Sequence, residues 1–210
     1  MKTWDKALKE VSLWGKPKNI IDKLILGLTQ DNDMNVRAVC AKKLGEAGVV
    51  NDKVTTALTR GLTDGENYVR IESVRALMAL NFSNEKIISI LKEYEGWYDY
   101  ESGILGCALV KFGHIDEDSI SRVAEGFLNL TEQSIQNECS EVLDAICSKE
   151  VLRYLEKGLN SSDENIRHRC EEIIDDYKAA VHYWTEDKTS RFTHHLSRIT
   201  HHASRFINRM

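Results

Sequence analysis

The sequence has very little proline and no long hydrophobic run. One proline occurs in 210 residues, and because proline breaks helix interiors, its scarcity favours long uninterrupted helices. No run of about 18 apolar residues is present, so no transmembrane helix is expected. The first 16 residues lack the continuous apolar core of a secretory signal and have the spacing of an amphipathic helix instead. Its apolar positions are Trp4, Ala7, Leu8, Val11 and Trp14.

Cysteine is sparse and dispersed. None of the five cysteines forms a CxxC pair. An odd, scattered set of thiols is typical of a reducing compartment, so we expect a cytoplasmic protein. The five are Cys40, Cys107, Cys139, Cys147 and Cys170.

The common catalytic motifs are also missing. The chain contains no GxGxxG, GxxxxGK[ST], GxSxG or HExxH pattern. Glu141 and Asp144 would share one face of a helix, but acidic pairs are common on any acidic helix, and two carboxylates without a convergent pocket do not make an active site. We therefore expect a protein that is not an enzyme and that needs no cofactor or metal ion.

Charge is distributed unevenly along the chain. The net charge is -5, yet residues 179–210 hold five Lys/Arg and two acids and carry five of the seven histidines. The body is therefore acidic, which argues against a main surface that binds nucleic acid.

A sequence repeat is the strongest positive feature. An aspartate, a Val-Arg pair, a small residue and a leucine recur in register after Asp31, Asp64 and Ser162, and weaker copies begin at Tyr100 and Ser134. The steps between aligned positions are 33, 32, 34 and 31 residues. Two helical patterns per unit at this period predict an α-solenoid of about five helix pairs. The aligned positions are Val36, Val69, Glu101, Ile135 and Ile166.

Each unit is predicted to contain a first and a second helix. Apolar-periodic segments that begin near Ile20, Val54, Ile87, Ile120 and Val151 predict the first helices. The capping-box patterns Thr63-x-x-Glu66 and Ser161-x-x-Glu164, and Pro17 in a first turn, support these boundaries. We place the second helices near 34–47, 67–80, 99–112, 133–147 and 164–177.

The repeated pattern resembles HEAT repeats, in particular the short repeats of the phycobilisome-lyase-like type. The resemblance covers roughly residues 17–178, and the Val-Arg pair is replaced at positions 101–102 and 135–136. It implies an all-α superhelix of the armadillo-like kind, flanked by a capping helix at 1–16 and a basic segment at 179–210. It also implies ion pairs between the repeated arginines (Arg37, Arg70, Arg167) and the turn carboxylates (Asp31, Asp33, Asp64, Asp163).

One slot of the repeat holds small side chains. Cys40, Cys139 and Cys170 each lie four residues after the aligned position, where Ser73 and Leu105 stand in the other units. Because free cysteine packs as a small hydrophobe, we expect these three thiols to be buried between helices rather than reactive.

The second helices of such arrays generally line the concave face, which is the usual binding surface. Positions two and six residues after the aligned one are predicted to face outward there. They are basic or apolar in the early repeats and acidic in the later ones. Such a groove suits a protein ligand that carries the opposite charges along its length; alternatively, these residues form an ordinary solvated surface. These positions are Ala38, Lys42, Ile71, Arg75, Gly103, Cys107, Asn137, Glu141, His168 and Glu172.

An aromatic cluster interrupts the third unit. Trp97, Tyr98 and Tyr100 stand where a turn and a helix start are expected, followed by the small residues Gly103 and Gly106. Tryptophan and tyrosine are enriched in binding hot spots, so these three are candidates for partner contact; alternatively they fill a gap in a distorted repeat.

The C-terminal segment contains three seven-residue units. Phe192, Leu196 and Ile199 begin an apolar stripe on a predicted helix. His194 and His201 are seven residues apart, too far to close a metal site in one chain. The segment could cap the array, pair with a second copy, or bind an anionic membrane or nucleic acid. Its basic line is Arg191, Arg198 and Arg205.

Taken together, the sequence predicts a non-enzymatic adaptor or scaffold that binds another protein through the concave face. Its candidate contacts are Trp97, Tyr98, Tyr100, Lys42, Arg75, Glu141 and Glu172. The alternative is binding of nucleic acid or an anionic membrane through the C-terminal helix. A chromophore-lyase-like activity is implied only by the repeat resemblance.

Overall fold

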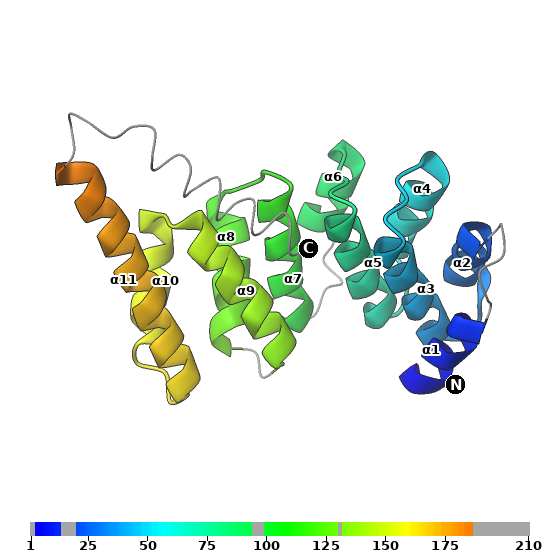
Figure 1. Cartoon of the computed structure of the whole chain (residues 1–210), viewed down its shortest axis with the longest axis horizontal. Helices are drawn as coiled ribbons and strands as arrows, with labels where there is room; N and C mark the ends of the chain where they lie inside the picture. Colours follow the sequence, from blue (N-terminus) through cyan, green and yellow to red (C-terminus); the bar gives the residue numbers. More distant parts are fainter. Residues whose placement is uncertain (1–2, 14–19, 94–98, 130–131, 187–210) are drawn as a thin grey trace. The chain divides into compact units, whose positions relative to one another are not determined.

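The structure is a computed structural model that describes residues 3–13, 20–93, 99–129 and 132–186, and this part of the chain is helical without strands (Figure 1). The all-α architecture predicted from the repeat is therefore confirmed. The helices are α1 (Trp4–Leu13), α2 (Ile20–Gln30), α3 (Met34–Glu46), α4 (Asp52–Gly61), α5 (Asn67–Ala79), α6 (Glu85–Glu93), α7 (Asp99–Lys111), α8 (Glu117–Asn129), α9 (Gln133–Ile146), α10 (Lys149–Gly158) and α11 (Glu164–Glu186).

The chain forms two compact units, Met1–His114 and Ile115–Met210. In unit 1 the first helices α2 and α4 pack side by side, and the second helices α3, α5 and α7 stack in a separate row. Unit 2 repeats this plan, since α8 packs on α10 and α9 on α11. Each unit thus has the two-row helix packing of a helical-repeat solenoid.

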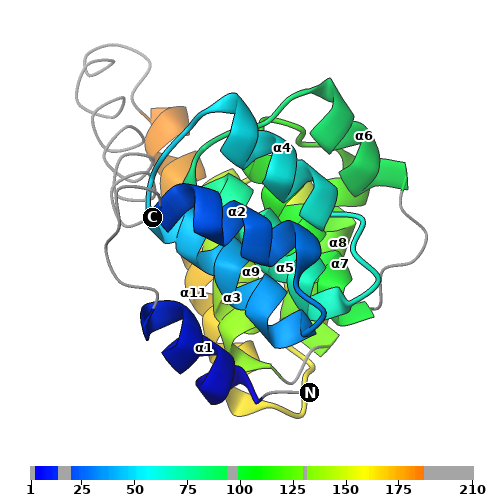
Figure 2. The same ribbon diagram turned by 90° about the vertical axis from the view of Figure 1, so that its right-hand side faces the viewer.

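The N-terminal helix α1 occupies the row of second helices. It packs on α3, as α3 packs on α5. Figure 2 looks onto this end of unit 1 and shows α1 apart from α2 and beside α3. The contact buries Ala7 and Val11, two of the residues whose spacing predicted an amphipathic helix. An otherwise exposed apolar side of α3 is covered in this way.

The helix boundaries agree with the predicted ranges to within a few residues, except that α11 continues to Glu186 instead of ending near 177, so the first residues of the predicted linker are helical. Residues 178–186 contain no glycine or proline that would end the helix. The predicted capping boxes are wrong. The helix α5 begins after Glu66, whose side chain makes no cap hydrogen bond, and the Thr63 hydroxyl donates to the Arg60 carbonyl instead. At α11 the cap is Asp163, which accepts from the Asn165 amide. An aspartate one residue before the helix reaches the free N–H groups better than a hydroxyl two residues further away.

Small residues let the two rows approach closely. A Cβ added to Gly61 would collide with the Ser73 hydroxyl, and one added to Gly158 would collide with the Cys170 sulfur. The three thiols of the repeated slot are buried, as predicted. Burial raises the pKa of Cys40 to about 12 and that of Cys170 to about 11, which makes both thiols poor nucleophiles.

Several positions predicted to face outward are buried. Ala38 is 0% exposed, Ile71 5% and Cys107 1%, and Gly103 is buried as well. The prediction is wrong here because α3 packs against α1, α2 and α5 together, and α5 against α3, α4 and α7, so that little of either helix reaches solvent. In unit 2 the equivalent Asn137, Glu141, His168 and Glu172 are exposed, as predicted.

Cys147 differs from the other four cysteines because it is exposed. Its φ of 42° ends α9 in the left-handed conformation. Partial burial and then the charges of Asp144 and Asp176 raise the pKa of its thiol. With a chromogenic disulfide reagent we expect one fast-reacting thiol per native chain, at a rate that keeps rising above pH 8.5, the ordinary thiol pKa being about 8.5. Cys147→Gly should remove the fast phase; its persistence would contradict the assignment.

Candidate functional site

The repeated arginine closes the turn between the two helices of one repeat. Its guanidinium donates to the carbonyl oxygen six residues earlier, from Arg37 to Asp31 at 3.0 Å and from Arg70 to Asp64 at 3.0 Å. The side chain of the same turn residue accepts the amide two residues on, as Asp31 does from Asp33 and Asp64 from Glu66. Arg167 repeats the bond to the Ser161 carbonyl at 2.7 Å. These arginines therefore serve the fold of each turn.

Two of these arginines also tie neighbouring repeats of unit 1 together. Arg37 binds both carboxylate oxygens of Asp64 at 2.9 Å, the predicted type of ion pair, and this bond raises the pKa of Arg37. Arg70 binds both oxygens of Glu101 at 2.9 Å, with 4% and 0% of the two side chains exposed. Glu101 was not among the predicted carboxylates. It stands at the aligned position of the third helix pair of the repeat, where the other pairs have an apolar residue and where the repeat pattern is weakest.

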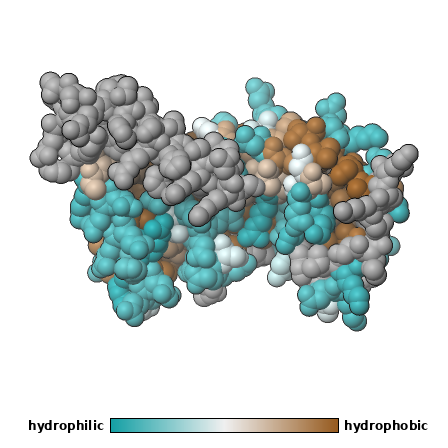
Figure 3. Space-filling model, viewed as in Figure 1, coloured by the Kyte–Doolittle hydropathy of each residue, from teal (hydrophilic) through white to brown (hydrophobic). Residues whose placement is uncertain are grey.

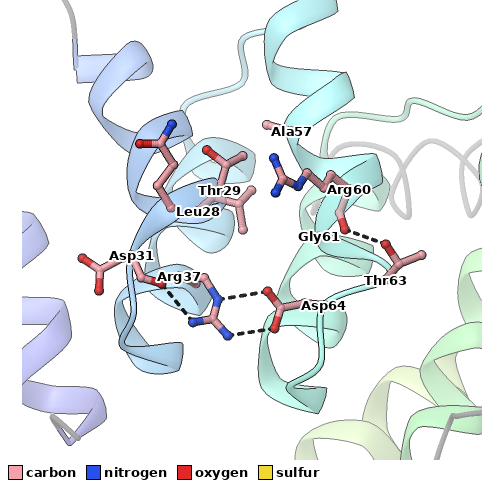
Figure 4. Close-up of a pocket in the computed structure, with 10 residues that line it drawn as sticks. Leu28, Thr29, Asp31, Arg37, Ala57, Arg60, Gly61, Thr63 and Asp64 are labelled. Atoms are coloured by element: carbon pink, nitrogen blue, oxygen red, sulfur yellow. Dashed lines mark hydrogen bonds and ion pairs between the residues drawn. The ribbon is translucent and has the colours of Figure 1, made fainter.

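A polar pocket lies between the C-terminal ends of α2 and α4 in unit 1 (Figure 4). It encloses about 310 Å³. The Arg37–Asp64 pair forms one wall, and the Arg60 side chain extends across the opening from α4 toward α2. We call it the turn pocket. Its lining residues are Leu28, Thr29, Gln30, Asp31, Arg37, Ala57, Arg60, Gly61, Thr63 and Asp64.

An acidic surface lies on the two second helices of unit 2. Arg169 on α11 donates to Asp144 on α9 at 3.2 Å and to Glu172 at 3.0 Å, which joins the two helices. Burial lowers the pKa of Arg169, but Glu172 and Asp144 outweigh this effect, so the pKa is raised. Figure 3 shows mainly hydrophilic side chains over α9 and α11. We define the acidic face of unit 2 as Glu141, Asp144, Glu172 and Asp176.

The acidic face carries more negative charge than its own cation balances. Glu141 is exposed one helical turn before Asp144, and the charges of Asp144 and Asp176 both act on the Cys147 thiol. Asp144 and Glu172 share the guanidinium of Arg169, and the His168 ring lies 3.5 Å from Glu172. The four carboxylates that define the acidic face thus outnumber its one arginine. The surface suits a cationic partner.

The other predicted contact residues belong to unit 1 or lie outside the described residues. In unit 1 Lys42 is exposed on α3, and Arg75 on α5 bonds Glu72 at 3.3 Å. Trp97 and Tyr98, together with the Tyr100 side chain, lie outside the described residues. The predicted C-terminal contacts Arg191, Arg198, Arg205, His194 and His201 lie outside them as well.

Within the described ranges, no three His, Cys, Asp or Glu side chains are grouped so that they could hold a metal ion. No helix there has the length and apolar character needed to span a bilayer.

Comparison with known proteins gives little further information. No family model matches the chain, and no curated protein matches it. Among solved structures, the crystal structure of an engineered protein from a structural genomics consortium is similar, with 18% sequence identity and a TM-score of 0.46. The match covers 84% of this chain and 90% of the engineered one.

Proposed function

We propose that this chain is a HEAT-like adaptor that binds a basic segment of a partner protein through the acidic face of unit 2. The observation that carries the proposal is the cluster of exposed carboxylates that α9 and α11 present together, with Arg169 as the guanidinium that joins them. Lysine and arginine side chains of a partner would find several acceptors within one surface, and such complementarity chiefly speeds association and selects partners.

The core beneath this face is consistent with a binding role. Ile135, Cys139, Ile166 and Cys170 hold the two helices in place from below and are at most 5% exposed. The carboxylates therefore project from rigid helices, which limits the entropy lost when a partner binds.

Charge reversal on the acidic face tests this function. The full chain with Glu141→Lys and Glu172→Lys should lose at least about tenfold in affinity for partners captured from nuclease-treated lysate, because like charges then face each other. The captured proteins are identified by mass spectrometry, purified and titrated against each variant at two salt concentrations.

Glu156→Lys is the matched control. Glu156 is exposed on α10 in the row of first helices, and its replacement makes the same charge change away from the acidic face. Equal binding by the double variant and the native chain would reject the proposal, as would equal losses in the double variant and the control. Capture of lipid alone, or of nucleic acid alone from a lysate without nuclease treatment, would support binding through the C-terminal segment instead.

A further inference from the structure

Arg60 differs from the other arginines of unit 1 described in the structure. Arg37, Arg70 and Arg75 each bond a carboxylate at 3.3 Å or less. For the Arg60 side chain no hydrogen bond or ion pair with another described residue is found, although Asp64 stands four residues later. Asp64 is already held by Arg37 and by the Glu66 amide. A guanidinium with five N–H donors is thus left facing the turn pocket (Figure 4).

The groups around Arg60 favour an anion in the pocket. The Arg37–Asp64 pair is internally neutral. The carbonyl oxygens of Arg60 and Gly61 at the end of α4 are already bonded by the amides of Thr63 and Asp64. Asp31 is the remaining carboxylate, and Figure 4 shows its oxygens pointing away from Arg60. The unbalanced charge that faces the opening is therefore positive.

A second, more apolar hollow adjoins the turn pocket. It encloses about 430 Å³ and is lined by Lys23, Leu26, Gly27, Gln30 and Asp31, of which the last two also line the turn pocket. Leu26 is 51% exposed there. Hydrophobic side chains gather over the α2–α4 part of unit 1 in Figure 3. An exposed leucine beside a hollow is a place where an apolar side chain of a ligand gains contact.

We propose that the two adjoining hollows bind an acidic segment of a partner protein, with a carboxylate on Arg60 and a neighbouring apolar side chain against Leu26. The two cations at the rim, Arg60 and Lys23, exceed the single carboxylate of Asp31. A guanidinium binds a carboxylate through two parallel hydrogen bonds, which fixes the orientation of the segment. The site is distinct from the acidic face, lies in the other unit and selects the opposite charge, so the chain would join an acidic partner to a basic one.

Nuclear magnetic resonance on the full chain tests the site directly. The probe is an acetylated and amidated Glu-Leu-Glu peptide, and the readouts are the Arg60 Nε–Hε signal and the backbone amides of Leu26 and Gln30. All three should shift with the peptide and saturate together. A Gln-Leu-Gln peptide should bind at least about tenfold more weakly, because the charge-assisted hydrogen bonds are lost.

Variants and other probes separate the possible outcomes. Arg60→Gln should weaken binding of Glu-Leu-Glu about tenfold, whereas Arg153→Gln, a replacement of an exposed arginine in unit 2, should leave it unchanged. Equal shifts with glutarate would overturn the peptide site in favour of a small dicarboxylate site. Shifts only with vesicles containing phosphatidylserine, or no shift of Arg60 with any probe, would overturn it as well.

The test is independent of the proposed function. Glu141→Lys with Glu172→Lys should leave the Arg60 titration unchanged, and Arg60→Gln should leave capture of a basic partner unchanged. Loss of only one of the two activities in each variant would establish two sites of opposite charge. Loss of both in either variant would overturn the separate site in unit 1.

Discussion

Glu101→Gln should destabilise unit 1 by about 3–5 kcal/mol, the largest effect that we expect from a single conservative substitution. The side chain of Glu101 is 0% exposed and binds both of its oxygens to Arg70, which is 4% exposed. The glutamine keeps the size of the side chain but leaves the charge of Arg70 buried without a counter-charge at this position. The free energy of unfolding is measured by urea denaturation followed by circular dichroism.

Replacement of both partners provides the decisive comparison. Arg70→Met with Glu101→Leu removes the two charges together, and a buried ion pair is often replaced by apolar residues at little cost. The double variant should therefore be more stable than Glu101→Gln alone. Asp118→Asn is the control, since Asp118 is 61% exposed in its pair with Arg122 and should change stability by less than about 1 kcal/mol. A Glu101→Gln variant as stable as this control would contradict the expectation.

Gly158→Ala should destabilise unit 2 by about 1–3 kcal/mol, because the added methyl group overpacks the contact between α10 and α11. A Cβ at this position would collide with the Cys170 sulfur and lie 2.7 Å from Leu128 Cδ2. The end of the leucine side chain can rotate away, whereas the sulfur is held in the core. The urea midpoint is the readout.

Cys170→Ala should recover part of this loss. Without its sulfur, the nearest atom of residue 170 is the Cβ, 3.7 Å from the new methyl group, which is ordinary contact. In a double-mutant cycle the two substitutions together should cost less than the sum of the single ones. Gly65→Ala, where no atom lies within 4 Å of the added Cβ, is the control and should not destabilise. Strict additivity in the cycle would show that the collision does not set the cost.

The acidic face and the turn pocket were predictable to different degrees. Glu141 and Glu172 follow from counting along the repeat, because a polar residue at a regular helical position is normally on the surface. Arg60 could not be chosen from the sequence, where it is one of many cations at the end of a helix. Only the contacts show that Asp64, its natural partner four residues on, is held by Arg37 of the preceding repeat.

The sequence by itself determined the helices, their order and their pairing. The recurrence of Val36, Val69, Ile135 and Ile166 specifies one buried position per repeat. Helix periodicity is a local property of the sequence, so it can be recognised without knowing which helices are neighbours in space. The preference for a small residue at the position of Cys40 and Ser73 could likewise be interpreted from the sequence, because a close approach of two helices excludes larger side chains.

The tertiary structure alone decided which helix faces are covered and which charges remain available. Ala38 and Ile71 are buried because second helices on both sides enclose them, and Glu101 is an internal ion-pair partner rather than a surface acid. Both outcomes depend on residues about thirty positions away, which the local pattern does not contain. Burial and ion pairing depend on neighbours in space, so only the packed structure shows which charged side chains remain on the surface and available to a partner.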